Sequence, residues 1–303
     1  MKSHTFLMSI AANLRLWARA LRLHQWIKNA LIFVPLVLAG GVATLTDCEN
    51  VLLGFVILSL TASTTYIFND YMDIKADRVH PTKKLRPFAS GELSSTAGIG
   101  AAIILILCVA ALLSYMPINF IYALAAYVVL TITYSTFLKR RAIIDVLALA
   151  TLFMLRIVIG MVLLPTPVSY WLLLFSFFFF LSLAFVKRYA ELNDLAQAHG
   201  HKVSGRVYII TDRPFIMSAG LASTFAGCLV FVIYITNEHF SNNIYTNPQW
   251  LWAICGVLVY WLARIWFLTS RGAMNQDPIL FALTDRASLA MGALTAIFIA
   301  LAW

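Results

Sequence analysis

The chain has 303 residues, of which 61% are hydrophobic and 12% are charged. A soluble globular domain has about 45–50% apolar and about 25% charged residues, so this composition excludes the soluble, disordered and fibrous classes and indicates a protein embedded in lipid. The net charge of +9 would indicate a nucleic-acid partner in a soluble protein. In a membrane protein it indicates which loops face the cytoplasm, so we expect no nucleic-acid partner.

The first segment is amphipathic. Between residues 7 and 23, apolar side chains recur at helical spacing and arginines take the opposite side. This pattern is typical of a helix that lies in the headgroup region of a membrane. We predict that residues 1–24 form an N-terminal interfacial helix and that residues 25–303 form a single transmembrane domain.

Nine apolar segments follow, and each is close to the roughly 20 residues that a transmembrane helix needs. They cover residues 27–45, 51–71, 95–115, 118–137, 143–164, 168–186, 214–236, 249–269 and 285–302. Lys and Arg concentrate in alternate loops, at 72–94, 139–141 and 187–213. Because cytoplasmic loops carry the excess of Lys and Arg, we expect a multi-pass protein of the inner (cytoplasmic) membrane with its N-terminus in the cytoplasm and its C-terminus outside.

Four polar side chains cluster where the second predicted span ends, namely Asn69, Asp70, Asp73 and Asp77. If the helix continues through this stretch, all four share one face. Carboxylates this close repel one another unless a cation neutralises them. Mg²⁺ prefers oxygen ligands and usually bridges a few carboxylates to substrate phosphates. We therefore predict a metal–diphosphate site here, rather than a solvated helix end paired with neighbouring basic residues.

Two further stretches supply candidate substrate ligands. In the basic run at 80–91, Lys83, Lys84 and Arg86 are candidates for holding phosphate oxygens that the metal does not reach, with ordinary cytoplasmic charge as the alternative. In the stretch 187–194, Lys187 or Arg188 is a candidate for phosphate. Glu191 is a candidate for metal or a ribose hydroxyl, and a surface pair with Lys187 is the alternative.

Charges inside the predicted spans also need an explanation. Arg156 lies about halfway along the fifth span, where a charge costs roughly 2.5–3.5 kcal/mol. It shares a helical face with Asp145, so we expect it to point into the bundle. The sequence leaves open whether Arg156 contacts substrate or braces the bundle. Lys28 starts the first span, and snorkelling explains it nearly as well as phosphate binding.

The stretch 69–77 resembles the UbiA superfamily of intramembrane prenyltransferases, because it matches the first aspartate motif of that family, NDxxDxxxD, in full. The resemblance covers essentially the whole chain. Within the superfamily the chain is similar to the polyprenyl-phosphate phosphoribosyltransferase branch, on the stretches 25–29, 80–91, 187–191 and 277–286. The second motif departs from that of the aromatic-acceptor members, because it is reduced to Glu191 and Asp194. The number of metal ions is therefore left open.

The resemblance implies an all-α integral membrane fold of nine transmembrane helices around a central cavity that opens to the cytoplasm. It implies a Mg²⁺-dependent enzyme that moves 5-phosphoribose from phosphoribosyl diphosphate (PRPP) to a polyprenyl phosphate such as decaprenyl phosphate. In this interpretation Asp70, Asp73 and Asp77 are catalytic and, with Asn69, hold Mg²⁺. The substrate-binding candidates are Lys28, Tyr66, Lys83, Arg86, Tyr134, Lys139, Lys187, Arg188 and Glu191.

Two other functions remain as alternatives. The first is a prenyltransferase proper, in which the same Mg²⁺ activates an isoprenyl diphosphate and an aromatic acceptor attacks. The second is a transporter, which is disfavoured because the acidic residues concentrate at one membrane face and no repeated halves are evident. The expected partners are the two substrates and the bilayer, and assembly into a homo-oligomer is left open.

Overall fold

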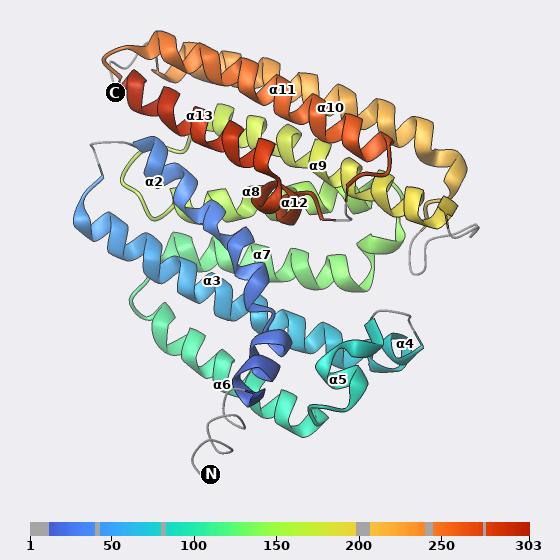
Figure 1. Cartoon of the computed structure of the whole chain (residues 1–303). Helices are drawn as coiled ribbons and strands as arrows, with labels where there is room; N and C mark the ends of the chain where they lie inside the picture. The colour runs from blue at the N-terminus through green and yellow to red at the C-terminus, as the bar shows by residue number, and fades with distance from the viewer. Residues whose placement is uncertain (1–11, 40–42, 80–82, 198–206, 240–244, 275–276) are drawn as a thin grey trace, which may run out of the picture. The chain divides into compact units, whose positions relative to one another are not determined.

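The computed structural model describes residues 12–39, 43–79, 83–197, 207–239, 245–274 and 277–303. Within these ranges all the longer elements are helices (Figure 1). The chain falls into two compact units, which we describe one at a time. Unit 1 comprises Met1–Ile132 and Arg156–Thr166, and unit 2 comprises Thr133–Leu155 and Pro167–Trp303. The single domain predicted for residues 25–303 stays a prediction.

Unit 1 is organised around one long helix, α3 (Leu45–Met72), which starts at a capping box between Thr44 and Asp47. Its other helices are η1 (Leu23–Phe33), α2 (Val34–Ala39), α4 (Ile74–Arg78), η3 (Lys83–Leu85), α5 (Pro87–Ser90), α6 (Ser95–Leu113), most of α7 (Ile118–Thr136) and the end of α8 (Ile144–Met161). A Cβ atom at Gly160 would lie 2.1 Å from the Ile32 carbonyl oxygen. Glycine is therefore required where α8 packs directly on the backbone of η1.

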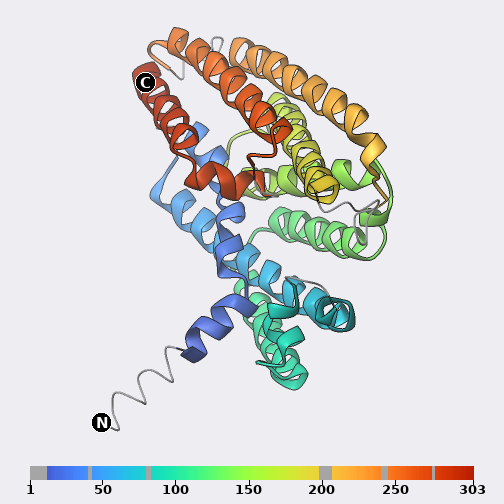
Figure 2. The ribbon, with the colours of Figure 1, turned by 45° about the vertical axis from the view of Figure 1, so that its right-hand side comes forward.

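Unit 2 contains the start of α8 together with α9 (Tyr170–Gln197), α10 (Arg213–Tyr234), α11 (Leu251–Ser270), α12 (Pro278–Thr284) and α13 (Arg286–Ala302). Its short elements are η4 (Leu138–Arg140), η5 (Ile210–Asp212), η6 (Ile235–His239) and η7 (Pro248–Trp250). Figure 2 shows α10 and α11 side by side. Ser182 on α9 joins these helices, because its hydroxyl bonds the Thr224 hydroxyl at 2.7 Å and accepts from the Trp266 indole at 3.0 Å. Such polar contacts are typical of helix packing in membranes.

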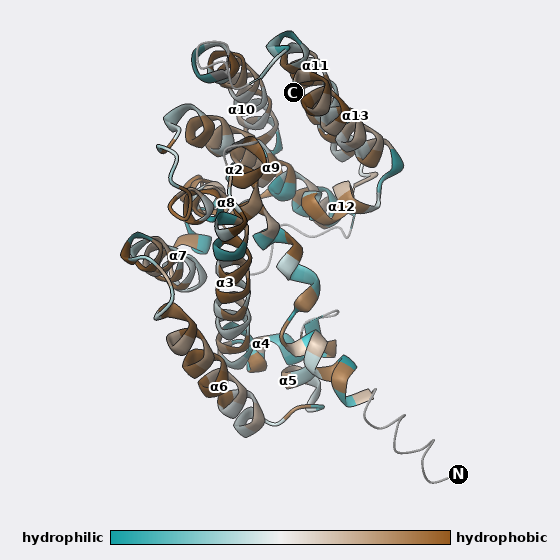
Figure 3. Ribbon diagram, turned by 90° about the vertical axis from the view of Figure 1, so that its left-hand side faces the viewer, coloured by the Kyte–Doolittle hydropathy of each residue, from teal (hydrophilic) through white to brown (hydrophobic). Residues whose placement is uncertain are grey.

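The surface of α6 shows which solvent the helices require. Its most apolar window has a mean hydropathy of 2.6, yet only 6% of that window is buried inside the protein. Figure 3 shows the ribbon of α6 largely in the colour of hydrophobic residues. An apolar surface that extends over most of an exposed helix is unfavourable in water. The helix therefore fits the lipid environment that the composition predicts.

The predicted spans are recovered in most cases. Within the described residues, seven helices are long and apolar enough to cross a membrane, and α12 with α13 makes an eighth if this pair, bent by 82°, forms one span. The first predicted span, 27–45, differs, because the described residues there form a shorter apolar helix, Leu23–Leu38, that is largely of the 3-10 type. Pro35 follows η1 and lacks the N–H that a continuous α-helix needs. Nine spans remain a proposal.

The predicted interfacial helix lies partly outside the described residues, which begin at residue 12. Residues 12–20 are helical. The apolar side chains of this helix, including Trp17 and the fully buried Ala20, pack in a cluster with Ile67 of α3 and Phe88 of α5. Part of the apolar face that the sequence assigned to lipid is therefore used inside unit 1. Its place at the membrane interface stays a prediction.

Candidate active site

A strained turn in the N-terminal segment places the first residue of the site in unit 1. Arg22 has φ 51° and ψ 47°, a left-handed conformation that residues other than glycine rarely adopt. The turn directs its guanidinium into an ion pair with Asp70 at the end of α3, and over the Tyr66 ring at 4.9 Å. Strained residues of this kind persist where the surrounding structure holds them, and they cluster at functional sites.

A second guanidinium joins two buried acids. Nη1 of Arg86 donates to Oδ1 of Asp70 at 3.1 Å and to Oδ2 of Asp77 at 2.7 Å. Each aspartate is 3% exposed, whereas the side chains of Arg86 and Arg22 are 27% and 23% exposed. An unpaired buried carboxylate would cost several kcal/mol, so these acids depend on the two arginines in the absence of another cation.

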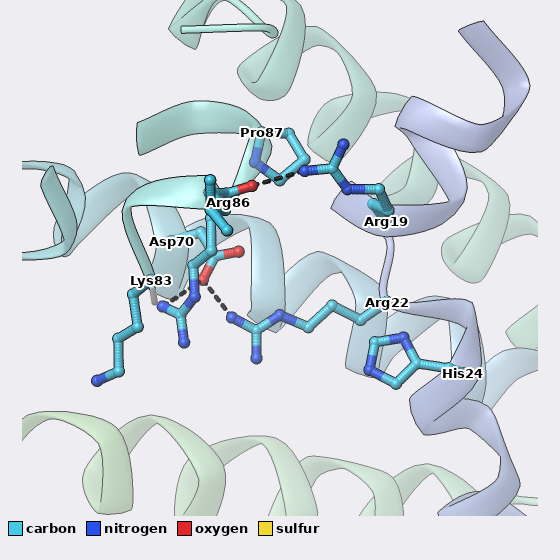
Figure 4. A pocket seen from close by; sticks show the side chains of 8 residues that line it. Arg19, Arg22, His24, Asp70, Lys83, Arg86 and Pro87 are labelled. Atoms are coloured by element: carbon cyan, nitrogen blue, oxygen red, sulfur yellow. Dashed lines mark hydrogen bonds and ion pairs between the residues drawn. The ribbon is translucent and has the colours of Figure 1, made fainter. Parts of the chain in front are cut away.

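Arg22, Asp70 and Arg86 line a pocket of about 440 Å³ (Figure 4). The residues around it are Arg19, Arg22, His24, Asp70, Lys83, Leu85, Arg86 and Pro87. Four of the eight are Arg or Lys and one is an acid, so the pocket is suited to an anion. Figure 4 shows the guanidinium groups of Arg22 and Arg86 converging on Asp70. The sequence analysis predicted Lys83 and Arg86 as substrate ligands. It did not predict Arg19 and Arg22, because it assigned them to the polar side of a membrane-surface helix.

The predicted metal ligands do not lie along one continuous helix. Helix α3 ends at Met72, and Asp73 occupies the junction with α4 at φ −93° and ψ 3°. The condition for a shared helical face is therefore not met, although Arg86 brings Asp70 and Asp77 together. In the described part of the chain, no group of three or more His, Cys, Asp or Glu residues is close enough to hold a metal ion. The role of Asn69 and Asp73 stays a prediction.

The two joined aspartates nevertheless fit a hard cation. Their hydrogen bonds among the described residues use Oδ1 of Asp70 and Oδ2 of Asp77. A carboxylate has about four lone-pair sites, so each side chain keeps acceptor capacity. Mg²⁺ commonly takes one or two carboxylates together with waters and substrate phosphates. The two side chains would supply the carboxylate part of such a ligand set, which waters and substrate phosphates would have to complete.

Arg156 is buried in unit 1, as the sequence predicts. It is 6% exposed, and its Nε donates to Oδ1 of Asn29 at 3.0 Å while Nη2 donates to the Tyr127 hydroxyl at 3.1 Å. These bonds join α8 to η1 and α7, so Arg156 braces the helices of unit 1. Lys28, another predicted substrate ligand, lies in η1.

Unit 2 contains a second arginine–carboxylate cluster. Arg188 on α9 is 1% exposed, and its Nε and Nη2 both donate to the carboxylate of Asp145 in the first turn of α8. Nη2 also donates to the Tyr134 hydroxyl at 3.1 Å, and Nη1 forms an ion pair with Glu191. The sequence predicted Tyr134, Arg188 and Glu191 as substrate ligands, but it considered Asp145 only as sharing a helical face with Arg156. The available signal was a lone carboxylate at the start of an apolar span.

The remaining candidates of unit 2 lie near this cluster in the sequence. Lys139 lies in η4, and Lys187 directly precedes Arg188 on α9; both side chains are partly buried. Glu191 forms an ion pair with Arg188, and the alternative predicted from the sequence, a surface pair with Lys187, stays a prediction. Glu191 is 14% exposed at its side chain.

Comparison with known proteins shows two kinds of curated relative. The chain is 40% identical over 92% of its length to the uncharacterized protein y4nM of Sinorhizobium fredii, of which it spans only about half (54%). It is 31% identical over 90% of its length to the nodulation protein NoeC of Azorhizobium caulinodans, of which it covers 88%. A shorter match covers 61% of the chain and 59% of the decaprenyl-phosphate phosphoribosyltransferase of Mycolicibacterium smegmatis, at 34% identity.

Solved structures and a family model define the fold. The structure of a UbiA homologue from Archaeoglobus fulgidus bound to GPP and Mg²⁺ matches with a TM-score of 0.68 over 94% of this chain and 97% of that one, at 16% identity. The model of the UbiA prenyltransferase family matches residues 30–284. With its apolar helices, the chain is therefore an integral membrane protein. It belongs to the UbiA prenyltransferase family, a family of transferases.

Proposed function

We propose that the chain is a Mg²⁺-dependent membrane phosphoribosyltransferase. It would transfer 5-phosphoribose from PRPP to a polyprenyl phosphate such as decaprenyl phosphate and release diphosphate. The observation that carries the proposal is the basic pocket of unit 1, in which four Arg or Lys residues gather beside a buried aspartate. A donor with a diphosphate and a further phosphate needs such a concentration of cations. The M. smegmatis relative is named a decaprenyl-phosphate phosphoribosyltransferase, which supports this donor.

Asp70 and Asp77 would hold Mg²⁺, with Asn69 and Asp73 as additional predicted ligands. When bound there, the ion stabilises the negative charge that develops on a leaving diphosphate. Arg22 and Arg86 have partly exposed side chains that face the pocket, so they are able to exchange a carboxylate for a phosphate oxygen when the donor enters. Arg19 and Lys83 extend the positive surface around that phosphate.

The proposed reaction breaks the bond between C1 of the ribose and the diphosphate oxygen, and forms a bond between C1 and an oxygen of the acceptor phosphate. The acceptor is already anionic, so no strong general base is needed. Further substrate-binding residues in this proposal are Lys28, Tyr66, Tyr134, Lys139, Lys187 and Glu191. The proposal also includes nine spans, a cytoplasmic N-terminus and an active site at the cytoplasmic face of the inner membrane.

A transfer assay with labelled donors tests this function. The purified protein in lipid nanodiscs is given decaprenyl phosphate, Mg²⁺ and labelled PRPP, and we expect a labelled lipid together with released diphosphate. A parallel reaction with labelled geranyl diphosphate and an aromatic acceptor tests the second candidate, a prenyltransferase. The family description and the A. fulgidus homologue bound to GPP favour that candidate. Label from geranyl diphosphate alone would reject phosphoribosyl transfer.

A further inference from the structure

The guanidinium of Arg86 lies between the two buried acids of unit 1. A single nitrogen of this group, Nη1, is 3.1 Å from Oδ1 of Asp70 and 2.7 Å from Oδ2 of Asp77. Because Mg²⁺ binds oxygen ligands at about 2.0–2.1 Å, an ion shared by these two oxygens would need the place that Nη1 takes. The guanidinium and a metal ion are therefore alternatives at this pair of oxygens.

The charges of the cluster are balanced by the protein itself. Two carboxylates, Asp70 and Asp77, lie within ion-pair distance of two guanidinium groups, Arg22 and Arg86. A free divalent cation on any other oxygen of these carboxylates would still lie close to a guanidinium, and like charges repel strongly in a site that is largely buried. A diphosphate that arrives with the cation supplies the negative charge that restores the balance. The cluster is therefore suited to a metal–diphosphate pair rather than to a free metal ion.

The backbone of Arg86 is held in place, whereas its side chain faces the pocket. Its N–H donates to the Lys83 carbonyl oxygen at 2.9 Å, and its own carbonyl oxygen accepts from the Ser90 N–H at 2.8 Å. The side chain is 27% exposed and lines the pocket beside Asp70 (Figure 4). Rotation of the side chain alone is therefore able to move the guanidinium from the acids to a phosphate in the pocket.

Arg22 differs from Arg86 in its contacts. In the described part of the chain, Arg22 forms its ion pair with Asp70 alone, and its guanidinium lies 4.9 Å from the centre of the Tyr66 ring. This cation–π contact holds the group at one side of the cluster. Arg86 is the arginine that both acids share, so its departure frees both carboxylates while Asp70 keeps one positive neighbour.

We propose that Arg86 is a specificity-determining residue, which makes the acid pair of unit 1 bind a divalent cation together with a diphosphate rather than alone. This inference rests on the Mg²⁺ site of the proposed function. When a diphosphate enters the pocket, the Arg86 guanidinium exchanges the carboxylates of Asp70 and Asp77 for phosphate oxygens, and both carboxylates become available to the cation. Binding of the two ligands is then coupled, and each raises the affinity for the other by the same factor.

Binding of Mn²⁺ tests this coupling without any reaction. Mn²⁺ prefers the same oxygen ligands as Mg²⁺, and its electron paramagnetic resonance signal distinguishes the free ion from the bound ion. The dissociation constant is measured with and without inorganic diphosphate, in nanodiscs of phosphatidylcholine, for the wild type, Arg86→Gln and Arg86→Lys. The matched control is Arg19→Gln. It removes the same charge from the same pocket, but Arg19 contacts Glu92 and the Leu85 carbonyl oxygen instead of the two acids.

We expect Arg86→Gln to bind free Mn²⁺ about tenfold more tightly than the wild type, and to lose most of the tightening by diphosphate. Arg86→Lys keeps the positive charge and should stay close to the wild type. Arg19→Gln should change the affinity for free Mn²⁺ by less than about threefold, because the charge that it removes is not shared by the acids. Mn²⁺ alone should also raise the Tm of Arg86→Gln more than that of the wild type, because the ion replaces the missing cation. The complex of Mn²⁺ with diphosphate in solution is the same in every sample, so differences between the proteins report the site.

Three results would overturn the inference. Equal affinity of the wild type and Arg86→Gln for free Mn²⁺ would show that the guanidinium does not oppose the cation. Equally tighter binding in Arg86→Gln and Arg19→Gln would show that only the total charge of the pocket matters. If Arg86→Gln does not fold, the wild type decides, because equal affinity for Mn²⁺ with and without diphosphate would exclude coupling.

The same measurements separate this inference from the proposed function. A phosphoribosyl donor and an isoprenyl donor both carry a diphosphate, so coupled binding would support the role of Arg86 even if PRPP proved not to be the donor. Uncoupled binding would reject that role even if phosphoribosyl transfer were observed. If none of the proteins bound Mn²⁺, with or without diphosphate, the metal site of the proposed function would be rejected together with this inference.

Discussion

The two units each contain an arginine–carboxylate cluster, and the clusters differ in how far the arginines are buried. In unit 1, Arg22 and Arg86 are about one quarter exposed and face a pocket. In unit 2, Arg188 is 1% exposed and is held by Asp145 on one side and Glu191 on the other. In the proposed function, the same pair of residue types thus gives exchangeable ligands in one cluster, whereas the buried arginine of the other cluster is fixed. Burial, rather than residue type, decides between these roles.

Removal of divalent cations should have the largest effect on activity. We expect a chelator to abolish transfer and Mg²⁺ to restore it, because the proposed site in unit 1 needs the ion to stabilise a leaving diphosphate. The measurement is lipid-linked product formed with and without excess chelator. Full activity in the chelator would remove the basis for treating the unit 1 cluster as a metal site.

Loss of a carboxylate in unit 1 should have the second largest effect on activity. Asp70→Asn and Asp73→Asn are each expected to lower turnover by about 10³-fold, because several kcal/mol of metal-dependent stabilisation are lost at about 1.4 kcal/mol per tenfold. Turnover is compared with the wild type, and size-exclusion chromatography checks that each variant folds. Normal turnover in Asp73→Asn alone would restrict the metal site to Asp70 and Asp77.

Replacement of an arginine in each cluster should show the difference between the two clusters as a difference in Tm. Arg188→Gln leaves the fully buried Asp145 without its cation, which typically costs about 3–5 kcal/mol, so we expect a large fall in Tm. Arg86→Gln should lower Tm less, because its side chain is partly exposed and solvent screens the pair. Its main effect should be a higher KM for PRPP. Equal losses of Tm would contradict the distinction between exchangeable and fixed arginines.

The smallest expected effect concerns the support of Asp145. Tyr208→Phe removes the acceptor of the Ile143 N–H, and we expect a loss of about 1 kcal/mol in the free energy of unfolding. Tyr122→Phe, the same substitution on the exposed surface of α7, serves as a control that should not change the free energy of unfolding.

Most of the helices and part of the candidate site could be predicted from local sequence. Apolar runs of sufficient length predicted the helices at 51–71 and 168–186, since the bilayer requires hydrogen bonds within each helix. The acids at 69–77 identified the end of α3. The interruption at Asp73 and the 3-10 form of Leu23–Phe33 were not predicted, because the hydropathy of a stretch does not distinguish a continuous α-helix from an interrupted or 3-10 helix.

The sequence by itself determined that this chain is a helical membrane protein with an acidic motif at the end of one span, because hydropathy and short-range spacing are local properties. Only the tertiary structure decided that Arg22 contacts Asp70, and that Asp145 fastens Arg188. These pairs join residues that are far apart in the chain. Their partners are selected by packing and by the cost of an unpaired buried charge, which no single stretch of sequence contains.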